Sequence, residues 1–184
     1  MFRRSLAVAL LAVVGAATWI VARQVVSGRA PSDRLADGEL MAARKAALDV
    51  LTAQLRAAEP ETRLSVLAGV GTTHDLALRA VVEESLGSAV PEVQAQAAAA
   101  LGQLGDRKAL PALRRAVGAG GPVSVQVAIA GALDQLGDPE GGRLLRQALS
   151  GADPVGRQRA AYVLVEQGDR AAQDLLAAVA AAPD

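Results

Sequence analysis

The chain has 184 residues, 19 basic and 19 acidic side chains, and no cysteine. The absence of cysteine excludes disulfides, thiolate metal sites and a cysteine nucleophile, and the balanced charge lacks the clustered basic face that nucleic acid requires. Aromatic residues are limited to Phe2, Trp19 and Tyr162. The core must therefore be built from leucine, valine and alanine, and because alanine and leucine are strong helix formers, we expect an all-α body.

Residues 6–22 form an uncharged apolar run behind the short basic start Arg3-Arg4. As a helix this run is about 26 Å long, slightly shorter than the roughly 30 Å hydrocarbon core of a membrane. We expect residues 1–26 to be a single-pass transmembrane anchor in the inner membrane of a bacterium. Small residues around Gly15 leave a cleaved signal segment, and so a secreted or periplasmic protein, as an alternative. A helix buried in the fold is a third.

The segment behind the apolar run predicts a tether and a first helix. Arg3 and Arg4 favour a cytoplasmic N-terminus under the positive-inside rule, which places the following soluble domain in the periplasm. Residues 27–39 are polar and contain Pro31 and Gly38, a composition typical of a flexible tether. Apolar residues then recur at helical spacing until Pro60, so we expect a helix over residues 40–58 at the start of the domain 40–184.

The most informative pattern is a turn that recurs three times. The runs are Leu101-Gly102-Gln103-Leu104-Gly105-Asp106, Leu133-Asp134-Gln135-Leu136-Gly137-Asp138 and Leu164-Val165-Glu166-Gln167-Gly168-Asp169. Their Gly-Asp pairs lie 32 and 31 residues apart. Self-similarity at such a period is typical of a stacked repeat array, which uses an extended surface rather than a single pocket.

The residues that start and end helices recur in phase with this turn. Pro91, Pro122 and Pro154 stand where a helix begins, because the missing N–H of a first-turn proline costs nothing. The glycine of each turn suits a left-handed helix end, and the following aspartate can cap the next helix. We therefore expect helix pairs in repeats at about residues 61–88, 91–118, 122–150 and 154–182. Their predicted core leucines are Leu101, Leu104, Leu133, Leu136 and Leu164, with Gln167 at the last equivalent position.

Two segments carry a family resemblance. They are Pro91-Glu92-Val93-Gln94-Ala95-Gln96-Ala97-Ala98-Ala99-Ala100-Leu101-Gly102-Gln103-Leu104-Gly105-Asp106 and Asp153-Pro154-Val155-Gly156-Arg157-Gln158-Arg159-Ala160-Ala161. Both resemble HEAT-like repeats of the short bacterial type, similar to those of phycobilisome-lyase-type proteins. The resemblance implies a short right-handed α-solenoid of about four helical hairpins, here behind the N-terminal hydrophobic helix.

The same resemblance indicates a candidate partner-binding face. Such repeats carry an arginine after the hydrophobic residue that begins the first helix, paired with an aspartate of the preceding loop. This chain has Gln94, Gln126 and Arg157 there, and only Arg157 keeps its aspartate, Asp153. The resemblance places these first helices on the concave side, so the three residues are candidates for contact with a partner. Alternatively, they hold adjacent repeats together by hydrogen bonds.

The sequence contains no strong motif for catalysis, phosphate binding or metal binding. His74 is the single histidine, and a catalytic base would need an orienting partner and a nucleophile within reach, so we expect His74 to be a surface residue at the start of a helix. Glu83-Glu84 and the basic cluster of Lys108, Arg114 and Arg115 are expected on solvated faces, and the glycine-rich residues 118–121 are expected in a loop between repeats. We expect no enzyme, cofactor or metal site.

The sequence thus favours a membrane-tethered interaction scaffold that binds a protein or peptide partner, with no role for nucleic acid. The membrane contact would be residues 6–22. Two alternatives remain: an accessory lyase-like factor that assists attachment of a prosthetic group to a partner protein, and a self-associating structural spacer.

Overall fold

The computed structural model describes residues 33–57, 59–170 and 172–173. These residues form helices, short 3-10 turns and loops, with no strand among them, which confirms the all-α prediction. No helix within the described ranges has both the length and the apolar character needed to cross a membrane. The expected anchor over residues 1–26, with its apolar stretch 6–22, lies outside them.

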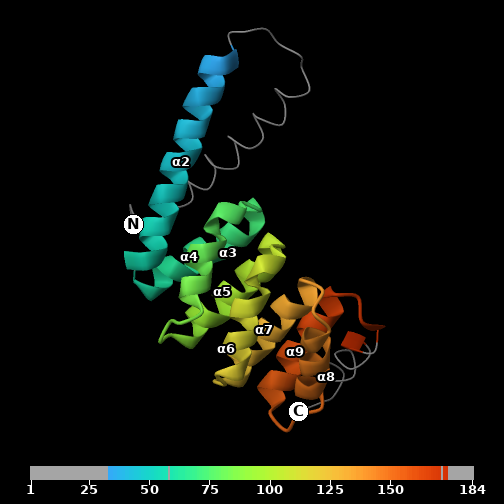
Figure 1. Ribbon diagram of the computed structural model, residues 1–184. Coiled ribbons are helices and arrows are strands. Elements are labelled where there is room, and N and C mark those ends of the chain that lie inside the picture. The colour runs from blue at the N-terminus through green and yellow to red at the C-terminus, as the bar shows by residue number, and fades with distance from the viewer. Residues whose placement is uncertain (1–32, 58, 171, 174–184) are drawn as a thin grey trace.

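The first described helix, α2 (Asp33–Ala57), begins earlier than the sequence predicts. Residues 33–39 of the predicted flexible tether are its first turns, so that part of the tether prediction is corrected. The physical reason is that a single Gly38 costs a helix only about 1 kcal/mol, which the surrounding alanine and leucine residues offset. Figure 1 shows α2 extending well beyond the stack that its C-terminal half joins.

Three helix pairs and the first helix of the fourth follow in the predicted order, while most of the second helix predicted for the fourth pair lies outside the described residues. We call the first helix of each pair the leading helix and the second the trailing helix. The leading helices are α3 (Pro60–Thr73), α5 (Pro91–Leu104), α7 (Val123–Gln135) and α9 (Pro154–Glu166). The described trailing helices are α4 (Arg79–Ser85), α6 (Leu110–Gly118) and α8 (Pro139–Leu149), with 3-10 turns at Leu76–Leu78 and Arg107–Ala109 ahead of the first two.

The turn inside each pair has the predicted geometry. Gly105, Gly137 and Gly168 have φ values of 73°, 76° and 85°, in the left-handed region that glycine tolerates best. His74 stands at the equivalent position of the first pair with φ 52°. It is exposed, as expected, but it ends α3 rather than starting the next helix.

The aspartate after each of these residues caps the helical turn that follows it, which is a 3-10 turn for Asp75 and Asp106 and the start of α8 for Asp138. The carboxylates of Asp75, Asp106, Asp138 and Asp169 accept hydrogen bonds from the backbone N–H of Ala77, Lys108, Glu140 and Ala172, respectively. These bonds satisfy N–H groups of the first turn, which have no partner inside the helix. The predicted capping role is therefore confirmed, and it extends to Asp75 in the first pair.

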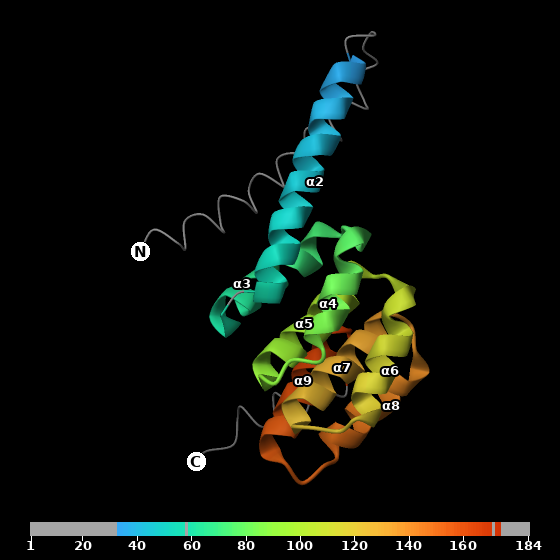
Figure 2. The same cartoon turned by 60° about the vertical axis from the view of Figure 1, so that its left-hand side comes forward.

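The helices form two layers. The leading helices follow one another along the molecule, and each packs directly on the next. Figures 1 and 2 show this row and, beside it, the trailing helices α4, α6 and α8. The second half of α2 packs on α3 and α4, so it occupies the place of a trailing helix at the N-terminal end.

Small residues allow the leading helices to approach closely. A Cβ atom at Gly102 of α5 would lie 2.3 Å from Gln135 Oε1 and 3.0 Å from Ala132 Cα of α7. At Gly71 of α3 it would lie 2.1 Å from Gln103 Oε1 of α5. The glycines at these crossings are therefore required by distance rather than by backbone conformation.

The core lies between the layers. Leu101, Leu133 and Leu113 are fully buried, and the predicted leucines Leu104 and Leu136 are 3% and 4% exposed. In the last repeat Gln167 stands at the position of these leucines, and its amide nitrogen and oxygen are buried without hydrogen-bond partners among the residues that the structure describes. The equivalent position is thus a buried leucine in two repeats, whereas in the last repeat it is a glutamine whose buried amide lacks these hydrogen bonds.

Candidate partner-binding face

The three predicted face residues all bind the loop that precedes their own helix. Gln94 Nε2 donates to the carbonyl of Ser88 at 2.6 Å, and Gln126 Nε2 donates to that of Gly121 at 3.0 Å. Arg157 donates to the carbonyls of Gly151 and Ala152 at 2.9 and 3.0 Å. These hydrogen bonds fasten the connection between one repeat and the next, as the structural alternative predicts.

Asp153 has a local role as well. Its Oδ2 accepts a hydrogen bond from the backbone N–H of Gly156 at 2.9 Å and so caps α9. Arg157 and Asp153 therefore both hold the loop between α8 and α9. A contact of Gln94, Gln126 or Arg157 with a partner stays a prediction.

Two other glutamines lie open on the leading helices. Gln103 and Gln135 occupy equivalent positions at the ends of α5 and α7, and both side chains are exposed. Each lies against a glycine of the preceding helix, Gln103 over Gly71 and Gln135 over Gly102. Neither amide has a hydrogen-bond partner among the described residues. These side chains can therefore donate to and accept from a partner without breaking a bond of the fold.

The equivalent positions of the outer helices complete a row, which we call the leading face. It consists of Thr72, Gln103, Gln135 and Glu166, one exposed residue from each leading helix. Helices in contact lie about 8–10 Å apart, so the row presents a polar group at that interval. The two middle residues of the row, Gln103 and Gln135, are uncharged, and each offers a side-chain amide for hydrogen bonding.

The opposite layer carries an ion-pair ladder, in which an arginine of one repeat reaches the capping aspartate of the next. Arg44 Nη2 lies 2.7 Å from Asp75 Oδ2, Arg79 Nε lies 3.0 Å from Asp106 Oδ2, and Arg114 Nε lies 2.7 Å from Asp138 Oδ2. The ladder thus joins neighbouring repeats through the aspartates that also cap the 3-10 turns ahead of α4 and α6 and the start of α8.

Asp138 is the most buried member of the ladder, at 3% exposure. The hydrogen bond from Arg114 holds the pKa of Asp138 below its usual value, and this effect outweighs burial, which acts in the opposite direction. The backbone N–H of Glu140 lowers the pKa further. Asp138 is therefore charged at neutral pH, and its two carboxylate oxygens are used by Arg114 and by the backbone N–H of Glu140.

The neighbouring carboxylates Glu83 and Glu84 are also engaged in the fold. Glu83 pairs with Arg79 of the same helix, whereas Glu84 pairs with Arg56 of α2 at 2.7 Å. The two neighbouring carboxylates therefore point to different partners and do not form an acid–base pair. Within the described residues, no group of three or more histidine, aspartate or glutamate side chains is arranged to hold a metal ion.

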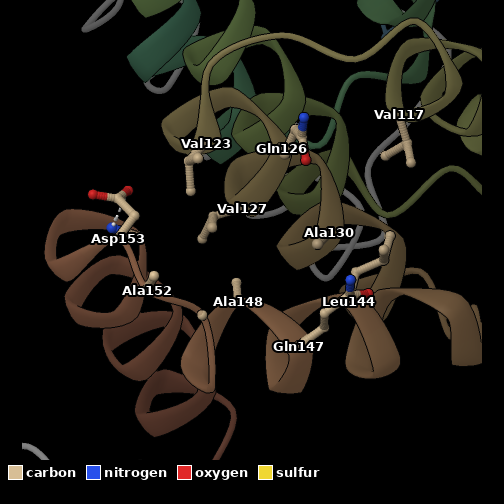
Figure 3. A pocket seen from close by; sticks show the side chains of 12 residues that line it. Val117, Val123, Gln126, Val127, Ala130, Leu144, Gln147, Ala148, Ala152 and Asp153 are labelled. Carbon is tan, nitrogen blue, oxygen red and sulfur yellow. Dashed lines mark hydrogen bonds between the residues drawn. The ribbon is translucent and has the colours of Figure 1, made fainter.

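A cavity of about 310 Å³ opens between the two layers in the third repeat. Figure 3 shows α7, α8 and the loop before α9 around it, with Val127, Ala130 and Ala148 at its wall. Gln126 and Asp153 supply polar groups. The structure thus brings one predicted face residue, Gln126, to this cavity, while Gln94 and Arg157 do not line it.

The comparisons with known families agree with this architecture. The sequence profile described as HEAT repeats matches residues 48–123, and the profile described as PBS lyase HEAT-like repeat matches residues 125–151. Together the two matches cover more than half of the chain, which therefore belongs to the HEAT-like repeat proteins. The first match begins inside α2, so this helix is part of the array. No curated protein matches the sequence.

Sequence reasoning missed both the open glutamines and the ladder. Gln103 and Gln135 occupy the same place in two copies of the repeated turn motif. That recurrence could have marked them as candidate surface residues, but it was used only to measure the period of the motif. The ladder gave a weaker signal, because its arginines lie at unequal distances in sequence from their aspartates. The only sequence signal for the ladder was the recurrence of an aspartate at the same place in each repeat.

Proposed function

We propose that this chain is an interaction scaffold that binds a protein or peptide partner along the leading face. The observation that carries the proposal is the exposed, unpartnered amides of Gln103 and Gln135 on neighbouring helices. An amide side chain both donates and accepts, so a row of them suits the main-chain amides of an extended segment. HEAT-type arrays in general present extended concave surfaces of this kind.

The spacing of the layers supports the choice of face. Neighbouring leading helices pack on one another, whereas α4, α6 and α8 contact their neighbours in the trailing layer far less. A stack whose helices are closer in one layer bends toward that layer. The leading face then lies on the inner side of the bend, where a bound segment contacts several repeats at once.

Site-specific photo-crosslinking in cells tests this proposal. A photoreactive amino acid replaces Gln103 or Gln135 in separate variants, and the control replaces Arg115, an exposed residue on α6 that does not line the cavity. We expect the same crosslinked partner from both leading-face positions and none from the control. A third variant, with the probe at Gln94, tests the originally predicted position. Equal crosslinking from position 115, or none from 103 and 135, contradicts the proposal.

The scaffold is proposed to be tethered to the membrane through residues 6–22, with its soluble domain in the periplasm. Support comes from the uncharged apolar character of this stretch and from Arg3 and Arg4 ahead of it. A tether raises the effective concentration of the array for partners at the membrane. Protease treatment of spheroplasts tests the orientation: digestion of the repeats without lysis is expected, and full protection contradicts it.

The lyase-like alternative rests on two observations, the match to the PBS lyase HEAT-like repeat and the cavity of the third repeat. Transfer of a prosthetic group needs an acid or base with freedom to act. Asp153 is the carboxylate at this cavity, and its Oδ2 is already used to cap α9. The scaffold is therefore the function that the geometry supports better.

A further inference from the structure

The last leading helix departs from the others at the position six residues before the left-handed residue of its turn. This position holds Ala68 in α3, Ala99 in α5 and Gly131 in α7, but Tyr162 in α9. A Cβ atom on Gly131 would lie only 2.9 Å from Val163 Cγ1 of α9, so this residue of α7 must be small where α9 stacks on it. Tyr162 therefore prevents a further helix from stacking on α9 at the same distance.

One exposed side of α9 is partly apolar and carries two opposite charges. We call it the α9 outer face and define it by Val155, Arg159, Tyr162 and Glu166. Val155 and Tyr162 are each 56% exposed, and Arg159 and Glu166 are exposed as well. Within the described ranges, neither charge forms an ion pair. Steps of four, three and four residues place all four side chains on one stripe of the helix, the spacing of a helix–helix seam.

We propose that the α9 outer face binds the α9 outer face of a second copy of this chain, with the two helices antiparallel and crossing near Tyr162. Glu166 lies about 6 Å along the axis on one side of Tyr162, and Arg159 lies about 4.5 Å along it on the other. Antiparallel crossing therefore brings Arg159 of each copy opposite Glu166 of the other. Parallel crossing would oppose like charges, so the charge pattern selects the antiparallel arrangement.

A second copy fits this face better than an unrelated partner because the face is complementary to itself. A two-fold axis near Tyr162 forms the same ion pair twice, Arg159 of each copy with Glu166 of the other, as expected of an isologous interface. Tyrosine at the centre of such a contact is a residue type that often dominates binding energy. The helix at the other end of the leading row, α3, has no exposed aromatic residue, and Thr62 and Ser65 are among its exposed residues. Glu166 is also the last residue of the leading face, but Tyr162 and Arg159 belong to the α9 outer face alone, so variants at these two positions test this inference separately from the leading-face proposal.

Sedimentation equilibrium of the full chain in an uncharged detergent tests the proposal. We expect a monomer–dimer equilibrium that Tyr162→Ser weakens at least about tenfold. Arg159→Glu weakens it similarly, because it places four carboxylates around the crossing. The double variant Arg159→Glu with Glu166→Arg restores it, because the swap returns each charge to an opposite one. Arg115→Glu, an exposed charge reversal on α6, is the control and leaves the equilibrium unchanged.

Disulfide trapping tests the orientation independently, and the cysteine-free chain permits it without background. Chains with Arg159→Cys are mixed with differently tagged chains with Glu166→Cys and oxidised. We expect crosslinks mainly between the two tags, because each position faces the other across the axis. A chain that stays monomeric, an association that ignores Tyr162→Ser and the charge reversal, or crosslinks mainly within one tag would each overturn the proposal.

Discussion

At the scale of single residues, the ion-pair ladder shows how one side chain serves two elements. Asp138 caps α8 through Glu140 and pairs with Arg114 of the preceding repeat. A buried carboxylate with both partners is stable as an anion, whereas the same group with one partner removed leaves an unsatisfied charge or dipole. The ladder therefore links the local end of a helix to the stacking of repeats.

The first prediction separates these two roles of Asp138. Asp138→Asn keeps an oxygen for the cap but removes the charge, so we expect a loss of about 1–2 kcal/mol of unfolding free energy at pH 7. Because the folded-state pKa of Asp138 is lowered, its contribution is fully present above the unfolded pKa of about 4 and is lost as pH falls through the folded pKa. Urea titrations at several pH values should show the two proteins converging below about pH 4. A constant difference down to the lowest pH would contradict this role.

The second prediction concerns Gln167, whose buried amide has no hydrogen-bond partner in the described part of the chain. Gln167→Leu restores the side chain found at Leu104 and Leu136, so we expect a stabilisation of about 1–2 kcal/mol in urea unfolding. Gln135→Leu is the matched control, because this glutamine is exposed and its replacement should stabilise nothing. A lower midpoint for Gln167→Leu would show that its amide is satisfied in solution.

At this scale the sequence predicted most of the local chemistry. The left-handed glycines and the aspartate caps follow from the intrinsic preferences of those residues and need no tertiary information. The partners of Gln94 and Gln126 were not predictable in the same way, because a long side chain can turn to a loop or to solvent. The burial of Gln167 depends on neighbouring helices and was visible only as a break in the leucine pattern.

At the scale of helices, crossing distance is set by glycine and alanine. The leading helices α5 and α7 contact through Gly102, which has no room for a side chain. At the start of α2, by contrast, a glycine does not decide the structure. Gly38 and its polar neighbours predicted a tether, but the helical propensity of the 25-residue segment outweighs them. Composition alone cannot decide such a boundary, because the cost of one glycine depends on the length of the helix around it.

The third prediction compares two helical glycines. Gly102→Ala forces its Cβ against Gln135 and the backbone of Ala132, so α5 and α7 must separate, at a cost of about 1–3 kcal/mol. Gly118→Ala, at the end of α6, meets no atom within 4 Å and should be neutral or stabilising by up to about 1 kcal/mol. Thermal unfolding followed by circular dichroism measures both. Equal effects would show that the helices are not held at this distance.

At the scale of the whole molecule, two apolar clusters share one helix. The first cluster runs from α2 to α7 and includes Ile129 and Leu133, and the second joins α7, α8 and α9 through Val127 and Ala130. Because α7 supplies both, the repeats on either side depend on it. Stacked repeats are stable through such shared interfaces rather than singly.

The period of the turn motif predicted this architecture, because each repeat must bury its apolar side against the next. The surface could not be predicted as fully. A binding face is defined by which side chains the packing leaves free, and the sequence pattern of Gln94, Gln126 and Arg157 looked as suitable as that of Gln103 and Gln135. Only the hydrogen bonds to the loops distinguish the two sets.

Native-state hydrogen exchange of the variant Leu136→Asp tests the central claim, that each repeat is supported by the next. Leu136 is 4% exposed at the end of α7, and a carboxylate there should cost more than about 3 kcal/mol. Leu76→Asp is the matched control, because this leucine is 53% exposed. We predict faster exchange in α5, α7, α8 and α9 together, with the control unchanged. Faster exchange confined to α7, with its neighbours still protected, would contradict the stacked array.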